Sequence, residues 1–112
     1  MSEKEKTALG LSPNFTATLS YVLGLASGLI VFVLEKENRF VRFHAMQSII
    51  LSIVAFIFYL VAIVMGRTSI IGLIFSTGWI VFTAFWFVGM INASQGKDYK
   101  LPIIGYFAEK QI

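Results

Sequence analysis

Residues 15–34 read FTATLSYVLGLASGLIVFVL, a run of twenty residues without a charged side chain. At about 1.5 Å per residue, a helix of this length matches the roughly 30 Å hydrocarbon core of a bilayer. The apolar part of a signal peptide is shorter and precedes a cleavage site with small residues, whereas here the polar stretch EKENR follows at residues 35–39. The run therefore predicts a membrane-spanning helix.

Two further apolar runs follow, at residues 40–65 and 70–93, joined by the short turn 66–69. Asn38 is the expected N-cap of the helix over 40–65, because its side chain can accept a hydrogen bond from the first helical turn. That helix is longer than the bilayer core requires, so its first turns are expected in the headgroup layer. The predicted fold is all-α: a compact bundle of three transmembrane helices within residues 15–93.

Polar segments flank this transmembrane domain. Residues 1–14 are interpreted as a solvated N-terminal tail, and residues 94–112 as a C-terminal tail. Within the second tail, Pro102 is expected to start a short helix that continues to Gln111. Its apolar content is too short to cross a bilayer, so the prediction is a helix lying in the membrane interface.

The composition excludes several classes of protein. Hydrophobic residues make up 57% of the 112 residues and charged residues only 13%. Soluble domains carry about 25% charged residues, so this composition excludes an ordinary soluble domain. The net charge of +3 is thinly spread and forms no stripe for nucleic acid. Because the chain has no cysteine, it has neither disulfides nor a thiolate ligand or nucleophile.

The distribution of lysine and arginine predicts an orientation. With three spans, one side of the membrane would hold three of these residues, namely Lys4, Lys6 and Arg67. The other side would hold six, namely Lys36, Arg39, Arg42, Lys97, Lys100 and Lys110. Since positive residues concentrate on the cytoplasmic side, the prediction is an integral protein of a prokaryotic cytoplasmic membrane, with its N-terminus outside and its C-terminus inside.

Small residues recur every four positions in the first apolar run, at Ser20, Gly24 and Gly28. The pair Gly24 and Gly28 forms a GxxxG pattern, in which missing side chains let another helix approach closely. We interpret these three residues as a helix-packing surface. The favoured partner is another helix of the same chain, and a dimer interface is the alternative.

Polar side chains cluster on one face of the second predicted helix, where His44, Gln47, Ser48, Ser52 and Tyr59 fall together at 100° per residue. Polar groups within a bilayer normally face protein or water, and histidine is the side chain that ordinarily titrates near neutral pH. We therefore define a candidate interaction or sensing site that consists of Arg39, Arg42, Phe43, His44, Gln47 and Ser48. The alternative is that the histidine and glutamine make structural hydrogen bonds and the arginines anchor to lipid headgroups.

The sequence indicates neither a catalytic site nor a site for a cofactor. The third run carries Phe75, Trp79, Phe82 and Trp86 at helical spacing, which favours packing and lipid contact over a quinone-like ligand. No acidic residue lies within a predicted span, and one histidine cannot supply the three or four ligands of a metal site. We expect no catalytic residue, metal or cofactor, and no enzymatic activity.

The stretch ENRFVRFHAMQSI at residues 37–49, preceded by YVLG at 21–24 and followed by KDYKLPIIGYFAEK at 97–110, resembles a known pattern. It is similar to small prokaryotic membrane proteins related to the chloroplast inner-envelope import component Tic-twenty. The specific part comprises Arg42, Phe43, His44, Gln47 and Ser48. The resemblance implies a compact helical membrane domain, and its plastid relatives are linked to protein import; this chain departs from them in having three predicted spans rather than four.

Together these features predict a non-enzymatic subunit or helper of a larger membrane assembly, with the segment from Arg42 to Ser48 as its contact or sensing site. Its partners would be the lipid bilayer and either other membrane subunits or further copies of itself, and not nucleic acid. The alternative is an oligomeric channel or transporter component related to protein import. In that case the polar face from His44 to Tyr59 would line the path.

Overall fold

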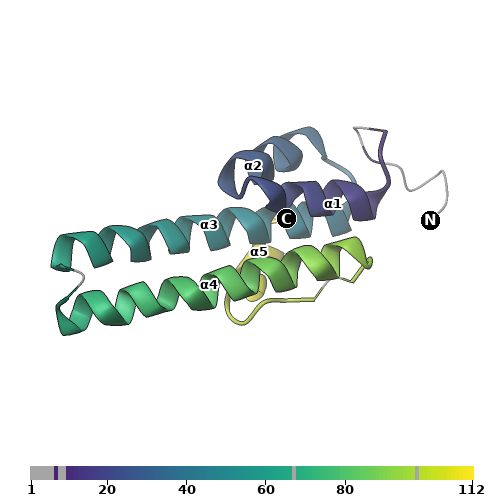
Figure 1. The fold of residues 1–112 in the computed structure, drawn as a ribbon. Helices are drawn as coiled ribbons and strands as arrows, with labels where there is room; N and C mark the ends of the chain where they lie inside the picture. Colours follow the sequence, from purple (N-terminus) through teal and green to yellow (C-terminus); the bar gives the residue numbers. More distant parts are fainter. Residues whose placement is uncertain (1–6, 8–9, 67, 98) are drawn as a thin grey trace.

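The computed structural model describes residues 7, 10–66, 68–97 and 99–112. Within these residues it contains five helices, α1 (Pro13–Val22), α2 (Leu25–Leu34), α3 (Arg39–Met65), α4 (Ile70–Ser94) and α5 (Ile104–Gln111). The two long helices, α3 and α4, lie antiparallel and form the axis of a molecule that measures 53 × 22 × 22 Å (Figure 1). The short helices pack on this hairpin near one of its ends.

The long hairpin agrees with the sequence prediction. Helix α3 starts one residue before the predicted run 40–65, and α4 ends one residue after the predicted run 70–93. The Asn38 side chain caps α3 by accepting from the Val41 amide at 3.1 Å, and Ser69 caps α4 by accepting from the Gly72 amide at 3.0 Å. Both helices are long and apolar enough to cross a membrane.

The single helix expected over residues 15–34 is wrong. The structure divides this run into α1 and α2, and the chain reverses direction between them at Leu23 and Gly24 (Figure 1). Gly24 has a φ of 61°, a conformation that a residue with a side chain rarely adopts. Two ten-residue helices folded against each other cannot each cross a bilayer core, so the described residues contain two helices of spanning length rather than three.

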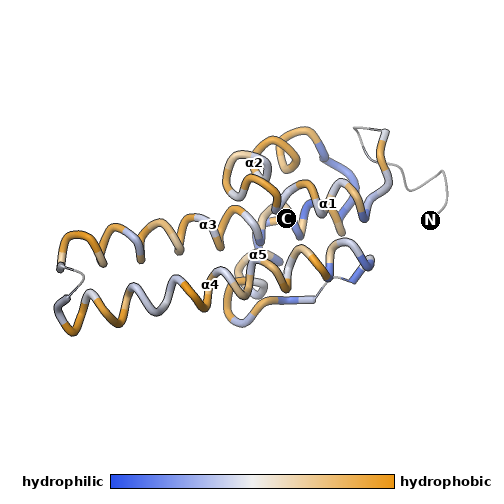
Figure 2. The backbone as a smooth tube through the Cα atoms, viewed as in Figure 1, coloured by the Kyte–Doolittle hydropathy of each residue, from blue (hydrophilic) through white to orange (hydrophobic). Residues whose placement is uncertain are grey.

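This reversal brings both ends of the described chain to the same end of the long hairpin. Gly96, just beyond α4, lies next to Asn14 at the start of α1. The connection from α2 to α3 lies there as well, and Figure 2 shows hydrophilic positions gathered in this region. We call this the charged end, defined by Lys36, Arg39, Arg42, Lys97, Lys100 and Lys110, and the opposite end around Gly66 and Ser69 the turn end. The predicted separation of the two termini across a membrane therefore loses its basis; Lys4, Lys6 and Arg67 lie outside the described residues.

The C-terminal tail is packed against the long hairpin. Leu101 is 1% exposed and packs with Leu51 of α3 and with Phe82 and Phe85 of α4. The short helix expected from Pro102 starts two residues later, at Ile104, and packs on α3. Its expected position in the membrane interface stays a prediction.

Candidate functional site: a buried polar cluster

Three polar side chains meet in the interior near the charged end. Tyr21 comes from α1, whereas His44 and Gln47 come from successive turns of α3, and all three are fully buried. We call these three residues the polar cluster. Since buried polar groups are costly unless they are hydrogen-bonded, each donor and acceptor in the cluster has to be accounted for.

Backbone groups of the C-terminal tail orient the side chains of Gln47 and His44. The Leu101 amide donates to Oε1 of Gln47 at 2.9 Å, so Nε2 of the same side chain faces the Tyr21 hydroxyl and donates to it at 2.8 Å. The tyrosine hydroxyl is hydrogen-bonded to Nδ1 of His44 at 2.8 Å. The other ring nitrogen, Nε2, faces the Lys97 carbonyl oxygen at 2.8 Å, and because a carbonyl only accepts, Nε2 is the donor there.

This arrangement connects three parts of the chain that are far apart in sequence. Aromatic edges enclose the ring, with the centroids of Phe40, Phe43 and Tyr21 at 4.8, 5.3 and 5.6 Å from that of His44. The polar cluster thus holds α1 and the C-terminal tail onto α3. At His44 and Gln47 the polar face is therefore buried inside the chain. The alternative of a polar path from His44 to Tyr59 stays a prediction.

The reversal between α1 and α2 has its own set of hydrogen bonds. Ser48 of α3 donates to the Gly24 carbonyl at 3.3 Å, and the Trp86 indole donates to the Tyr21 carbonyl at 2.5 Å. Ser27 accepts from the Leu23 amide at 3.0 Å and donates to the Ser20 carbonyl at 3.1 Å. Irregular backbone is tolerated at membrane depth where protein groups satisfy it, and these side chains do so here.

The predicted packing residues Gly24 and Gly28 contact α3 of the same chain, although they do not lie on one continuous helix with Ser20. Gly24 is the N-cap of α2, and a Cβ there would lie 3.0 Å from the Ser52 hydroxyl oxygen. Gly28 belongs to α2 and faces α3, where a Cβ would lie 3.1 Å from Cγ1 of Ile49 and 3.2 Å from the Ala45 carbonyl oxygen. We call α1 and α2 together the short hairpin. Its small residues thus allow close contact with α3.

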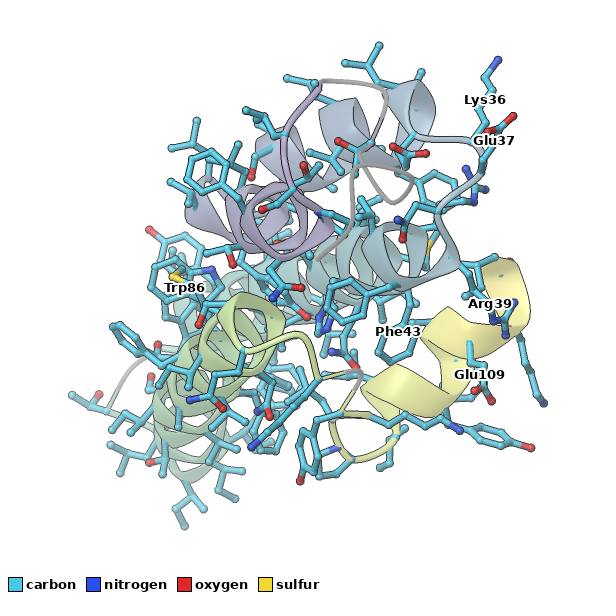
Figure 3. All side chains as sticks on the ribbon, turned by 90° about the vertical axis from the view of Figure 1, so that its right-hand side faces the viewer. Lys36, Glu37, Arg39, Phe43, Trp86 and Glu109 are labelled. Atoms are coloured by element: carbon cyan, nitrogen blue, oxygen red, sulfur yellow. The ribbon has the colours of Figure 1, made fainter. Side chains whose placement is uncertain are left out.

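The other predicted site residues occupy the charged end. One guanidinium nitrogen of Arg42 donates to the Phe32 and Glu35 carbonyls at 3.2 and 2.8 Å, and the guanidinium lies 4.0 Å from the centre of the Phe32 ring. Arg42 therefore closes the C-terminal end of α2, where carbonyls lack helical partners and a cation is favourable. Arg39 is exposed and shares a small depression with Phe43 and with Glu109 of α5 (Figure 3).

A groove opens where the short hairpin ends. It has a volume of about 640 Å³ and lies between the tip at Leu23 and Gly24 and the middle of α3 and α4. Its floor and walls include Ser52, Ala55, Tyr59, Trp79, Thr83 and Trp86. Several of its polar groups are already bonded within the chain: Ser52 to the Ser48 carbonyl, Thr83 to the Trp79 carbonyl, and the Trp79 indole to the Ala55 carbonyl. The groove is therefore an apolar surface at the middle of the long hairpin.

Sequence reasoning missed several residues of this region. The sequence prediction places Tyr21 within a spanning helix, although a polar-tipped aromatic residue within an uncharged run is a signal for a buried hydrogen bond. The sequence pattern groups Trp86 with the aromatic residues of its helix, whereas its indole donates to the Tyr21 carbonyl of α1. Glu35 is 5% exposed and accepts from the Glu37 and Asn38 amides at 3.2 and 3.0 Å, which shapes the connection into α3.

These features define a class: a small helical protein in which a hairpin of two helices of spanning length carries a shorter hairpin, formed by α1 and α2, and a docked C-terminal tail. The chain belongs to the magnetosome magnetite crystal formation protein family, whose sequence profile matches residues 4–108.

Archaeal relatives place the chain in a family of membrane proteins. It is 44% identical to a UPF0132 membrane protein of Methanocaldococcus jannaschii, over 92% of this chain and 72% of the relative. A second UPF0132 membrane protein of that organism is 39% identical, over 94% and 93% of the two chains. One from Archaeoglobus fulgidus is 36% identical, over 91% and 97%. No solved structure gives a significant match.

These findings correct the family predicted from the motif around His44. The resemblance to the import component Tic-twenty is wrong, because the matching profile and the relatives belong to the magnetosome and UPF0132 families. The proposed link to protein import falls with it. Membership of a family of membrane proteins agrees with the prediction from composition.

Proposed function

We propose that this protein is a non-enzymatic component of a membrane assembly, anchored by α3 and α4 and contacting its partner within the bilayer. The observation that carries the proposal is that the side chains of the polar cluster form hydrogen bonds within the chain. Its histidine, glutamine and tyrosine side chains are committed to holding α1 and the C-terminal tail in place. Side chains engaged in this way support a structural role for the motif around His44, and the contact surface is then found elsewhere.

The groove at the middle of the long hairpin is the best-supported contact surface. Small residues at Gly24, Ser52 and Ala55 allow another backbone to approach closely, which is the usual basis of helix association in lipid. Because the Trp79 indole and the Thr83 hydroxyl already donate to backbone carbonyls of this chain, the surface left for the partner is apolar. The occupant we propose is one transmembrane helix of a partner subunit.

The family's description names magnetite crystal formation. Within the part of the chain that the structure describes, no group of three or more histidine, cysteine, aspartate or glutamate side chains is placed to hold a metal ion. The proposal for this chain rests on the packing of its helices in the membrane. Crystal formation stays a property named for the family.

Site-specific photocrosslinking in native membranes tests the proposal. A photoreactive residue replaces Ala55, inside the groove, and in a matched variant it replaces Ile80, which is 71% exposed on α4. We expect a discrete protein adduct from position 55 and lipid adducts from position 80. The change Ala55→Leu, which fills the groove, should then abolish co-purification of that partner. Identical adducts from both positions would overturn the proposal. An adduct with a second copy of the chain would overturn the partner subunit and show self-association in its place.

A further inference from the structure

The protein is much thicker at its charged end than at its turn end. Eight residues of α3 between positions 39 and 51 are buried, whereas Ala62 is the one buried residue between positions 52 and 65, all of which the structure describes. In the first half of α4, Gly72 alone is buried. Long apolar side chains there are open to the surroundings, with Val64 79% and Ile70 78% exposed.

This asymmetry arises because both flanking segments stop at the same level. The short hairpin reaches its tip at Gly24, beside Ser52, and the C-terminal tail reaches its deepest buried contact at Leu101, beside Leu51. Both then turn back toward the charged end, where Ile112 shares a depression with Arg39. Figure 1 shows α1, α2 and α5 all gathered over one half of the long hairpin.

With α3 crossing the membrane as proposed, Ser52 lies near the middle of the bilayer. At about 1.5 Å per residue α3 is about 40 Å long, and Ser52 lies about 20 Å from Arg39. A hydrocarbon core of about 30 Å, centred on this helix, has its midplane near Ser52. One leaflet therefore surrounds α3 and α4 alone, and the other surrounds these two helices together with α1, α2 and the C-terminal tail.

We propose that the protein acts as a wedge in the bilayer, which concentrates it in curved membranes whose convex leaflet holds the charged end. Extra cross-section in one leaflet pushes the lipids of that leaflet apart, and convex curvature relieves this crowding. The hydrogen bonds of the polar cluster make the wide half a fixed shape, since they join its segments through backbone and side-chain groups. The wedge rests on the proposed crossing of the membrane by α3 and α4, but it needs no partner subunit.

Sorting of the purified full-length chain between giant vesicles and thin tubes pulled from them tests this proposal. Because the chain has no cysteine, one introduced by Gln111→Cys carries a single fluorophore at the charged end. A membrane-impermeant quencher separates molecules with this end outside from those with it inside. The vesicles contain neutral lipid, which removes attraction between the cationic end and anionic headgroups.

The expected result is a change of sign with orientation. Molecules with the charged end outside should have a tube-to-vesicle density ratio above one, and those with it inside a ratio below one. Equal ratios for both populations, or the opposite sign, would overturn the wedge. A second label introduced by Thr68→Cys checks insertion: the quencher should reach positions 68 and 111 from opposite sides. Quenching of both from one side would instead refute the crossing by α3 and α4.

Discussion

The hydroxyl oxygen of Tyr21 lies 2.8 Å from Nδ1 of His44, and this contact joins α1 to α3 across 23 positions of the sequence. The same hydroxyl accepts from Gln47, whose Oε1 is held by the Leu101 amide. A single phenolic oxygen thus lies between the short hairpin and the side chain that docks the C-terminal tail. Its removal should affect both segments at once.

Tyr21→Phe keeps the aromatic ring and removes this hydroxyl. Nδ1 of His44 loses this contact, and Nε2 of Gln47 keeps only the longer hydrogen bond to the Tyr99 carbonyl at 3.4 Å, so the free energy of unfolding should fall by about 1–3 kcal/mol. Denaturant titration in detergent micelles, followed by tryptophan fluorescence, measures the change. Tyr106→Phe is the matched control, because Tyr106 is 55% exposed on α5 and lies outside the cluster. Equal losses from the two variants would contradict the role given to Tyr21.

Substitutions of His44 distinguish a structural imidazole from a sensor. His44→Gln can replace one of the hydrogen bonds to Tyr21 and Lys97 and should cost little, whereas His44→Leu removes both of them and should cost about 1–3 kcal/mol. The same titration compares the two variants. A sensor would instead show partner binding that changes between about pH 5 and 8 in the parent and not in His44→Gln. That result would overturn the structural role.

The long helices could be predicted from sequence because an uncharged run longer than a bilayer core has few alternatives. The division of residues 15–34 could not, since the run carries no charged residue on either side of Gly24 and no proline marks the break. The chain reverses because Gly24 adopts a φ of 61°. A GxxxG pattern in the sequence does not reveal this angle, since the same pattern also occurs on continuous helices. Periodicity grouped His44 with Gln47, but their partners Tyr21, Lys97 and Leu101 lie 23 to 54 positions away.

Gly24→Ala tests the reversal between α1 and α2. It combines a positive φ with a Cβ 3.0 Å from the Ser52 hydroxyl oxygen. Gly66→Ala provides the control, because Gly66 has a φ of 82° and a Cβ there would meet nothing within 4 Å. Both variants should lose about 1 kcal/mol or more because a residue with a side chain is strained at positive φ, and Gly24→Ala should lose more because the Ser52 hydroxyl must also move away from the new Cβ. Equal unfolding free energies would mean that the tip does not pack on Ser52.

Arg42 and Arg39 should respond differently to loss of charge. Arg42→Met keeps an apolar stem over Phe32 but leaves the carbonyls of Phe32 and Glu35 without their donor, so the expected loss is about 1–2 kcal/mol. Arg39→Met changes an exposed side chain and should stay within about 0.5 kcal/mol of the parent. Thermal unfolding in one detergent compares them. If both arginines only anchor to headgroups, the two variants will unfold alike in micelles and differ from the parent only in lipid.

The sharpest test of the fold is the location of the chain ends. If α3 and α4 are the spanning helices, a re-entrant hairpin leaves Ser2 and Gln111 on the same side of the membrane, and the connection at Thr68 on the other. The shared side then holds eight of the nine lysine and arginine residues, and the other holds Arg67 alone, so the ends should face the cytoplasm. Single-cysteine variants at positions 2, 68 and 111, treated in intact cells with an impermeant thiol reagent, should label at position 68 only. Labelling at position 2 but not at 111 would restore three spans and would contradict the reversal at Gly24.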